Sequence, residues 1–180
     1  MTTAIVFDTE TTGLTKPLGT PLAKQPQIIE ICAIKLNDNL EEIACYETFV
    51  NPGKQLDPEI TRITGIQDKD VMNAPKFEEI YPGLASFFLG TDILVAHNLP
   101  FDRSLLTFEL ERLEKLRNFP WPIQHICTVN KSMKLEGYRQ SLANLYKIAT
   151  GKEHVKAHRA RGDVEATIEC FKYLIERNMV

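Results

Sequence analysis

The stretch Phe7-Asp8-Thr9-Glu10-Thr11-Thr12-Gly13-Leu14 decides how the rest of this sequence is interpreted. It is preceded by Ala4-Ile5-Val6, and a short apolar run that ends in polar residues is typical of a buried strand. Residues i and i+2 of a strand point to the same side, so Asp8 and Glu10 can direct two carboxylates toward one point. Two close carboxylates repel each other unless a proton or a cation lies between them, and Mg²⁺ prefers such oxygen ligands.

The turn after this strand contains Gly13, and a glycine lets the backbone turn freely and approach a ligand closely. A purely structural interpretation is also open, in which Asp8 caps the turn and Glu10 is solvated. The stretch alone does not decide between the two, so the choice depends on what the rest of the chain adds.

Length and composition indicate one soluble globular domain covering residues 1–180. Charged residues make up 25% and hydrophobic residues 43% of the chain, which is ordinary for such a domain. The sequence has no basic, apolar leader and no run of about 18 apolar residues, so we expect no signal peptide and no membrane contact. The four cysteines lie far apart without metal-ligand spacing, which favours a reducing, cytoplasmic setting.

The net charge of −3 argues against general electrostatic attraction to nucleic acid. An acidic site that holds metal ions can still bind phosphates, because the ions invert the local field. The basic residues also gather in one late segment, which is either a nucleic-acid contact or a solvated loop: Lys147, Lys152, Lys156, Arg159 and Arg161.

The remaining chain predicts a mixed sheet with helices on its faces. Apolar or alternating runs predict strands over residues 28–36, 43–50, 92–96 and 123–129. Helical spacing predicts helices over residues 58–63, 77–89 and 142–150, one after Asp102, and a final one from about residue 161. In the helix after Asp102, Leu106 and Leu110 lie on the apolar stripe, and Glu109 and Arg112 are expected on the exposed face. Three consecutive strands followed by alternating strands and helices indicate an α/β fold with a five-stranded sheet.

Acidic residues recur where this fold would place a functional cleft. Asp8 and Glu10 end the first strand, Asp102 opens the helix after the fourth strand, and Asp163 opens the last helix. Clefts of open α/β sheets lie outside the carboxyl ends of the strands. Four converging acids can hold two divalent ions, which together stabilise the attacking and leaving oxygens of an in-line phosphoryl displacement.

The motifs around these acids resemble the three motifs of the DEDDh, or DnaQ-like, 3′–5′ exonucleases. They are Asp8-x-Glu10, His97-Asn98-x-x-Phe101-Asp102 and His158-x-Ala160-x-x-Asp163, in that order along nearly the whole chain. Cys127-Thr128 and Ser141-Leu142-x-x-Leu145 are similar to further landmarks of the family. The resemblance implies an RNase H-like fold and a metal-dependent nuclease that uses two Mg²⁺ or Mn²⁺ ions.

By this resemblance, Asp8 bridges both metals, Glu10 and Asp163 bind the first, and Asp102 holds the second. His158 would then take the proton from the attacking water. A histidine suits this role because its unperturbed pKa, about 6.5, lies near the operating pH. The alternative for His158 is a surface histidine in a basic loop.

Other residues are candidates for substrate contact or for structure. An apolar clamp for the terminal nucleotide is expected from Leu14, Phe101 and either Ile63 or Ile66, although a core position is open for Phe101 and Ile63. Further substrate candidates are Thr11, Gly13 and Asn98. The remaining histidines are expected to be structural or solvated: His97, His125 and His154. Many relatives have His-Gly-Ile where this chain has Thr64-Gly65-Ile66.

The resulting expectation is an exonuclease that releases nucleoside 5′-monophosphates, mostly from single-stranded DNA. Three alternatives remain: an exoribonuclease, since no residue plainly reports on the 2′-hydroxyl; a binding module without catalysis, disfavoured by the intact acids; and a proofreading subunit bound to a DNA polymerase. The last helix is followed by no long tail, which favours a free-standing enzyme. The proline-rich loop over residues 15–27 is a lid, a docking site or a simple bulge.

Overall fold

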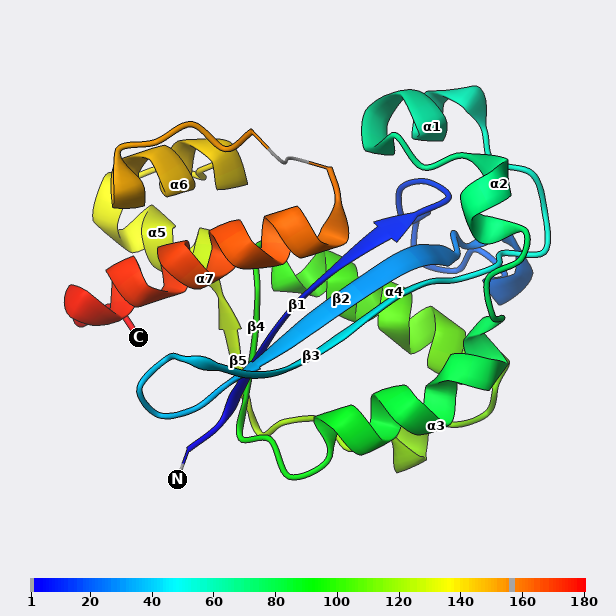
Figure 1. Ribbon diagram of the computed structural model, residues 1–180, viewed down its shortest axis with the longest axis horizontal. Helices are drawn as coiled ribbons and strands as arrows, with labels where there is room; N and C mark the ends of the chain where they lie inside the picture. Colours follow the sequence, from blue (N-terminus) through cyan, green and yellow to red (C-terminus); the bar gives the residue numbers. More distant parts are fainter. Residues whose placement is uncertain (1, 156–157) are drawn as a thin grey trace.

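A mixed five-stranded sheet is the centre of the computed structural model, which describes residues 2–155 and 158–180 (Figure 1). The strands are β1 (Ala4–Thr11), β2 (Ile28–Leu36), β3 (Glu42–Phe49), β4 (Ile93–Ala96) and β5 (Gln124–Cys127). Their order is β3-β2-β1-β4-β5; the β3–β2 and β2–β1 pairs are antiparallel, and the β1–β4 and β4–β5 pairs are parallel. The predicted α/β fold with a mixed five-stranded sheet is therefore confirmed.

Seven α-helices are found in the described part of the chain. They are α1 (Pro58–Thr64), α2 (Asp68–Val71), α3 (Phe77–Phe88), α4 (Leu99–Arg112), α5 (Thr128–Glu136), α6 (Leu142–Thr150) and α7 (Ala160–Glu176). Helix α5 was not predicted, and the last strand was predicted to extend to Val129. In the structure that strand stops at Cys127 and α5 begins at Thr128. Thr128 and Val129 are β-branched and favour a strand locally, but both are buried in the first turn of the helix.

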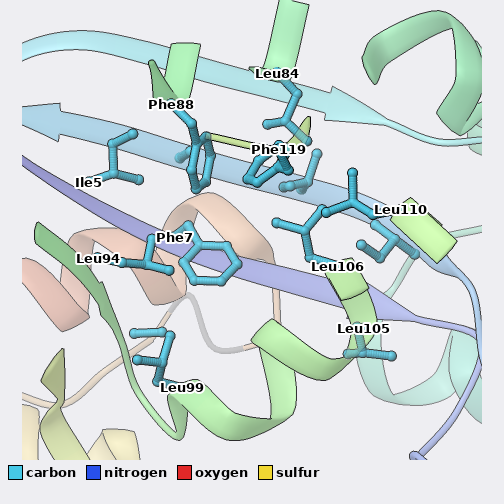
Figure 2. Close-up of a cluster of buried hydrophobic side chains, with 14 of the residues drawn as sticks. Ile5, Phe7, Leu84, Phe88, Leu94, Leu99, Leu105, Leu106, Leu110 and Phe119 are labelled. Carbon is cyan, nitrogen blue, oxygen red and sulfur yellow. The ribbon is translucent and has the colours of Figure 1, made fainter. Parts of the chain in front are cut away.

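Helices cover both faces of the sheet. On one face α7 packs Ala160, Val164 and Phe171 against Val6 of β1 and Ile34 of β2. On the other face α3 and α4 pack against the alternate residues of the same strands. Figure 2 shows this second cluster, in which Phe7 of β1 and Leu94 of β4 lie among Phe88 and Leu106. The central strand β1 is thus buried on both sides over its first half.

A buried ion pair in α4 corrects one expectation. Glu109 and Arg112 were expected on the exposed face, but Glu109 is 5% exposed and its Oε1 lies 3.0 Å from Nη1 of Arg112. The same carboxylate accepts a hydrogen bond from the Ile28 N–H, and Arg112 donates to the carbonyls of Leu22, Gln25 and Pro26. The pair therefore fixes the end of the proline-rich loop to α4, where paired charges tolerate burial.

The described helices also bear on membrane contact. None of them combines the length and the apolar composition that crossing a bilayer requires.

Candidate active site

The acidic side chains of β1 meet the first turn of α7. Asp8 and Glu10 follow Val6 on the face that α7 covers, because alternate strand residues share a face. Asp163 lies in the first turn of α7, and ligand oxygens of these three residues all lie within 4.8 Å of one another. Three carboxylates this close form a group that could hold a metal ion.

Asp102 lies beside this group but is held by a different neighbour. Strand β4 ends at Ala96, so α4 begins next to the open end of β1. Oδ1 of Asp102 accepts hydrogen bonds from the Thr9 N–H at 3.1 Å and from the Thr9 hydroxyl at 2.9 Å. Thr9 points to the opposite face of the sheet from Asp8 and Glu10. Thr9 was not predicted as a site residue, because its role appears only once the fold brings residues 93 positions apart together.

The pKa values of Asp8, Glu10 and Asp102 are all raised above their ordinary range. Burial, and then the neighbouring carboxylates of Asp102 and Asp163, raise the pKa of Asp8 well above its ordinary range. Burial and the adjacent Asp163 raise the pKa of Glu10 to about 8, and burial raises the pKa of Asp102 to about 7. In each case burial and nearby carboxylates disfavour the charged form of the acid. The donor set therefore fits a hard divalent cation, which would supply the missing positive charge.

These shifts predict how the stability of the metal-free protein depends on pH. A carboxyl whose folded-state pKa is raised stabilises the fold in acid, and that contribution is lost as the pH rises through the folded-state value. With Asp102 near 7 and Glu10 near 8, we expect the melting temperature in EDTA to fall between about pH 4.5 and about pH 8. Asp8→Asn removes one repelling charge and should melt higher than wild type near pH 8. Thermal unfolding followed by circular dichroism measures both effects.

Adding Mg²⁺ provides the control for this experiment. A ligand that binds the folded state stabilises it, so wild type should gain more in melting temperature than Asp8→Asn on addition of Mg²⁺. Equal gains in the two proteins, or a metal-free melting temperature that does not fall with pH, would contradict the proposed repulsion.

Two histidines lie next to Asp163. The backbone N–H of His158 donates to Oδ2 of Asp163 at 3.2 Å, while the His158 side chain is exposed and its φ of 65° is in the left-handed region. Nε2 of His154 lies 2.5 Å from Oδ1 of the same carboxylate, and its ring packs beside Tyr146. His154 was expected to be structural or solvated, so this contact was not predicted. Its position nine residues before Asp163, in a loop without periodicity, carries no signal of it.

The segment that carries His158 is fixed to the sheet by Glu30. This residue lies opposite Glu10 in the β1–β2 register and is 2% exposed. Its carboxylate accepts from the Arg159 guanidinium at 2.8 Å and from the Ala160 N–H at 3.0 Å. Arg159 also lies over the Phe49 ring. Because these contacts join strand β2 to the start of α7, they place His158 and Asp163 beside β1.

Most of the basic residues of the late segment are neutralised within the protein. Lys147 pairs with Glu153, and Arg159 pairs with Glu30. Arg161 contacts several acids of β3 and α7. Lys156 lies outside the described residues. Three of the five cations are therefore paired with acids, which reduces the positive charge that the described part of this segment offers to nucleic acid.

The candidate substrate residues divide into exposed and buried ones. Leu14 is 80% exposed and Ile63 is 42% exposed, whereas Ile66 is 1% exposed and packs with Ile29, Leu56 and Val71. Ile66 is therefore a core residue rather than part of a clamp, which leaves Ile63 as the member from that turn. Phe101 is half-buried against the main core.

The turns that follow β1 and β4 have defined local contacts. The Thr11 hydroxyl donates to the Gly13 carbonyl at 2.7 Å, which closes the turn before Leu14. Asn98 precedes α4 with φ 69°, and its Oδ1 accepts from Arg139 at 2.7 Å.

His97 is structural, in agreement with the sequence-based interpretation. Its Nδ1 lies 2.8 Å from the hydroxyl oxygen of Thr128, so it joins the end of β4 to the first turn of α5. Burial lowers the pKa of His97 to about 4. A neutral ring that only bridges two elements has a packing role.

A second group of metal-ligand atoms lies on β2 and β3. Cys32, Cys45 and Glu47 place their sulfur and oxygen atoms within 4.8 Å of one another. The Arg161 guanidinium already contacts Cys45 Sγ and Glu47 Oε2, each at 3.3 Å. This cation neutralises the group, so it differs from the unneutralised acids of β1.

Known proteins share both the sequence pattern and the fold. The family model described as Exonuclease (RNase_T) matches residues 5–171. The DNA polymerase III subunit epsilon of Treponema pallidum is 33% identical over 175 residues, which cover 94% of this chain and 74% of that protein. The DNA polymerase III PolC-type of Caldanaerobacter subterraneus subsp. tengcongensis is 33% identical over 96% of this chain, but the chain spans only 12% of that relative's length.

Among solved structures, the nuclease domain of 3′hExo, a DEDDh family member bound to rAMP, has a TM-score of 0.78. It is 18% identical, and the match covers 97% of this chain and 92% of that one. At this identity the likeness establishes the fold alone.

Proposed function

Because the chain belongs to the DEDDh, or DnaQ-like, family of 3′–5′ exonucleases, we propose that residues 1–180 act as one metal-dependent nuclease domain. The reaction is hydrolysis of the phosphodiester bond at the 3′ end of mostly single-stranded DNA, with release of nucleoside 5′-monophosphates. The observation that carries this proposal is the convergence of the Asp8, Glu10 and Asp163 carboxylates, where burial and neighbouring acids raise the pKa of Asp8 and of Glu10.

The acids would hold two divalent ions, Mg²⁺ or Mn²⁺. Asp8, Glu10 and Asp163 form one set of ligands, and Asp102, held by Thr9, would serve the second ion together with Asp8. When bound, the ions stabilise the attacking and the leaving oxygen of the displacement. The protein's own part is to fix these carboxylates from three elements and to orient the substrate phosphate toward them.

His158 is the proposed general base. It lies five residues before Asp163, its backbone contacts that carboxylate, and its exposed ring is free to turn toward a water at the scissile phosphate. The ring would take the proton from that water through a nitrogen and release it to solvent.

One assay tests the proposed function. Oligonucleotides of DNA and of RNA, labelled at either end, are incubated with Mg²⁺, with Mn²⁺ and with EDTA, and the products are sized over time. A 3′–5′ exonuclease shortens a 5′-labelled strand one nucleotide at a time and releases the 3′ label at once, only with metal. Faster decay of RNA would favour an exoribonuclease. Internal cleavage, or no cleavage, would contradict the proposal.

Assembly with a DNA polymerase is a further part of this proposal. Its support is the similarity to a polymerase III subunit over most of that subunit's length. Co-purification of the chain with a polymerase would support assembly. The labelled-oligonucleotide assay, run on the complex and on the isolated chain, then separates a polymerase-bound subunit from a free-standing enzyme.

The exposed Leu14 gives a prediction about substrate binding. It follows the turn that Thr11 closes, and its side chain is 80% exposed, so it can cover the face of a terminal base. Fully burying a leucine side chain contributes about 1.5–3 kcal/mol, and a base that covers part of it gains a fraction of this. We expect Leu14→Ala to raise KM for single-stranded ends several-fold, with kcat and melting temperature nearly unchanged.

Leu18 provides the matched control for this prediction. It is also fully exposed, but it lies further along the loop, so Leu18→Ala should leave KM unchanged. A lower melting temperature with unchanged KM for Leu14→Ala would mean that Leu14 stabilises the fold rather than the substrate.

A further inference from the structure

A cavity of about 620 Å³ lies on the flank of α4 toward β5 and α5. Its apolar floor includes Leu99 and Cys127, and its rim carries Arg103, Asn130 and Lys131. Its lining residues come from α4, from His125 and Cys127 of β5 and from the first turn of α5. Because α4 follows β4 and α5 follows β5 (Figure 1), the cavity adjoins the edge of the sheet where these two strands end. Ligand clefts of α/β sheets occupy this edge, and the acidic site lies at the same edge.

The charge of this cavity is opposite to that of the rest of the protein. Among the described residues, none that lines it is acidic, whereas the groove between α7 and the β2–β3 hairpin is lined by Glu42, Glu153, Glu165 and Glu169. The chain as a whole carries a net charge of −3. A cationic cavity beside an acidic site in an acidic protein is suited to an anionic ligand.

The cations of this cavity are also free of acidic partners. Five arginines that do not line this cavity each pair with a carboxylate: Arg62, Arg112, Arg159, Arg161 and Arg177. Within the part of the chain that the structure describes, Arg103 and Lys131 make no ion pair, and Arg103 only lies over the Trp121 ring. Their charges are therefore available to a ligand.

The cavity and the acidic site share one helix. Asp102 and Arg103 are adjacent in α4, with Asp102 turned to β1 and Arg103, about 100° further round the helix, lining the cavity. A helix is about 10–12 Å across, so a strand that crosses it reaches the cavity within a few nucleotides. Arg139, which donates to Asn98 at the start of the helix, adds a third cation near this crossing.

We propose that this cavity is a phosphate subsite for the substrate strand, a few nucleotides before its 3′ end. The proposal rests on the proposed nuclease function and specifies how its substrate is held. Arg103 and Lys131 bind backbone phosphate oxygens, while Ser104, Thr107 and Asn130 supply polar groups beside them. Contacts of this kind fix a strand without reading its sequence.

The test measures the binding of short and long strands separately. The inactive Asp8→Asn protein binds 5′-fluorescein oligothymidylates in the presence of Mg²⁺, and fluorescence anisotropy gives the Kd for a dinucleotide and for a strand of about ten nucleotides. Arg103→Gln and Lys131→Gln should each weaken binding of the long strand by about three- to fivefold, as expected for one lost phosphate contact. The slope of log Kd against log salt concentration should fall by about 0.7 for each contact that is lost. The Kd for the dinucleotide should not change.

Three further variants make the result specific. Arg103→Lys keeps the charge and should restore most of the long-strand affinity. Arg117→Gln and Lys134→Gln each remove one cation that does not line the cavity and should bind both strands as the parent does. Equal losses for both strand lengths, equal losses in these two controls, or no loss at all would overturn the subsite.

The outcome also separates this inference from the proposed function. If the wild-type protein degrades strands and the Arg103 and Lys131 variants bind the long strand as tightly as the parent does, the subsite alone is wrong. If the wild-type protein degrades no strand, the nuclease proposal is wrong, and the binding series still shows whether the cavity holds phosphate.

Discussion

Asp8→Ala is expected to abolish exonuclease activity, with a loss of about 10³-fold or more in kcat. Asp8 is the acid proposed to serve both ions, because it lies with Glu10 and Asp163 and because Asp102 is, after burial, the largest cause of its raised pKa. Ions bound in this way contribute several kcal/mol to the transition state, and each 1.4 kcal/mol is worth about tenfold in rate. Single-turnover degradation of a 5′-labelled strand measures the loss.

The matched control for this substitution is Asp92→Ala. Asp92 is also a carboxylate next to β1, but it accepts from the Thr3 N–H at the opposite end of the strand. It should retain near-wild-type activity. A variant at Asp8 that keeps as much as a tenth of the wild-type rate would rule out the two-metal assignment, whereas a matching loss at Asp92 would mean that general destabilisation causes both.

His158→Ala is expected to lower kcat by about 10²–10⁴, the range for loss of a general base. Binding of Mn²⁺ should persist, because the three carboxylates remain. The neighbouring His154 makes the test discriminating, since it contacts the same Asp163 carboxylate through its ring. His154→Gln should change metal affinity more than the chemical step if His154 only contacts Asp163.

The rate of each variant is followed against pH, together with Mn²⁺ affinity. Loss of the acidic limb in His158→Ala alone would support His158 as the base. Loss of that limb in His154→Gln, with a normal profile in His158→Ala, would transfer the base role to His154.

The sequence predicted those parts of the fold that depend on local pattern. Helix α6 has the predicted bounds because Ser141 caps it and Gly151 ends it, both by local chemistry. The β2 prediction also agrees, since its run is buried on both faces. Helix α5 was missed because its β-branched first turn favours a strand locally, and tertiary packing overrides that preference.

The site was predictable where residue type and position suffice, and not where partners come from afar. The convergence of Asp8, Glu10 and Asp163 follows from their positions at strand and helix ends. The Thr9–Asp102 and Glu30–Arg159 contacts do not, because each joins segments about a hundred positions apart whose approach depends on the whole sheet. Periodicity likewise cannot show that Ile66 is a core residue in a short turn.

The position of Asp163 on the last described helix has a consequence for protein synthesis. The three clustered ligands come from residues 8, 10 and 163, so a chain emerging from the ribosome carries the first two long before the third. Domains fold as units once their contacts are available. A nascent chain on its messenger RNA would therefore lack a competent site until α7 docks on the sheet, and premature degradation of nearby nucleic acid would be avoided by the order of synthesis alone.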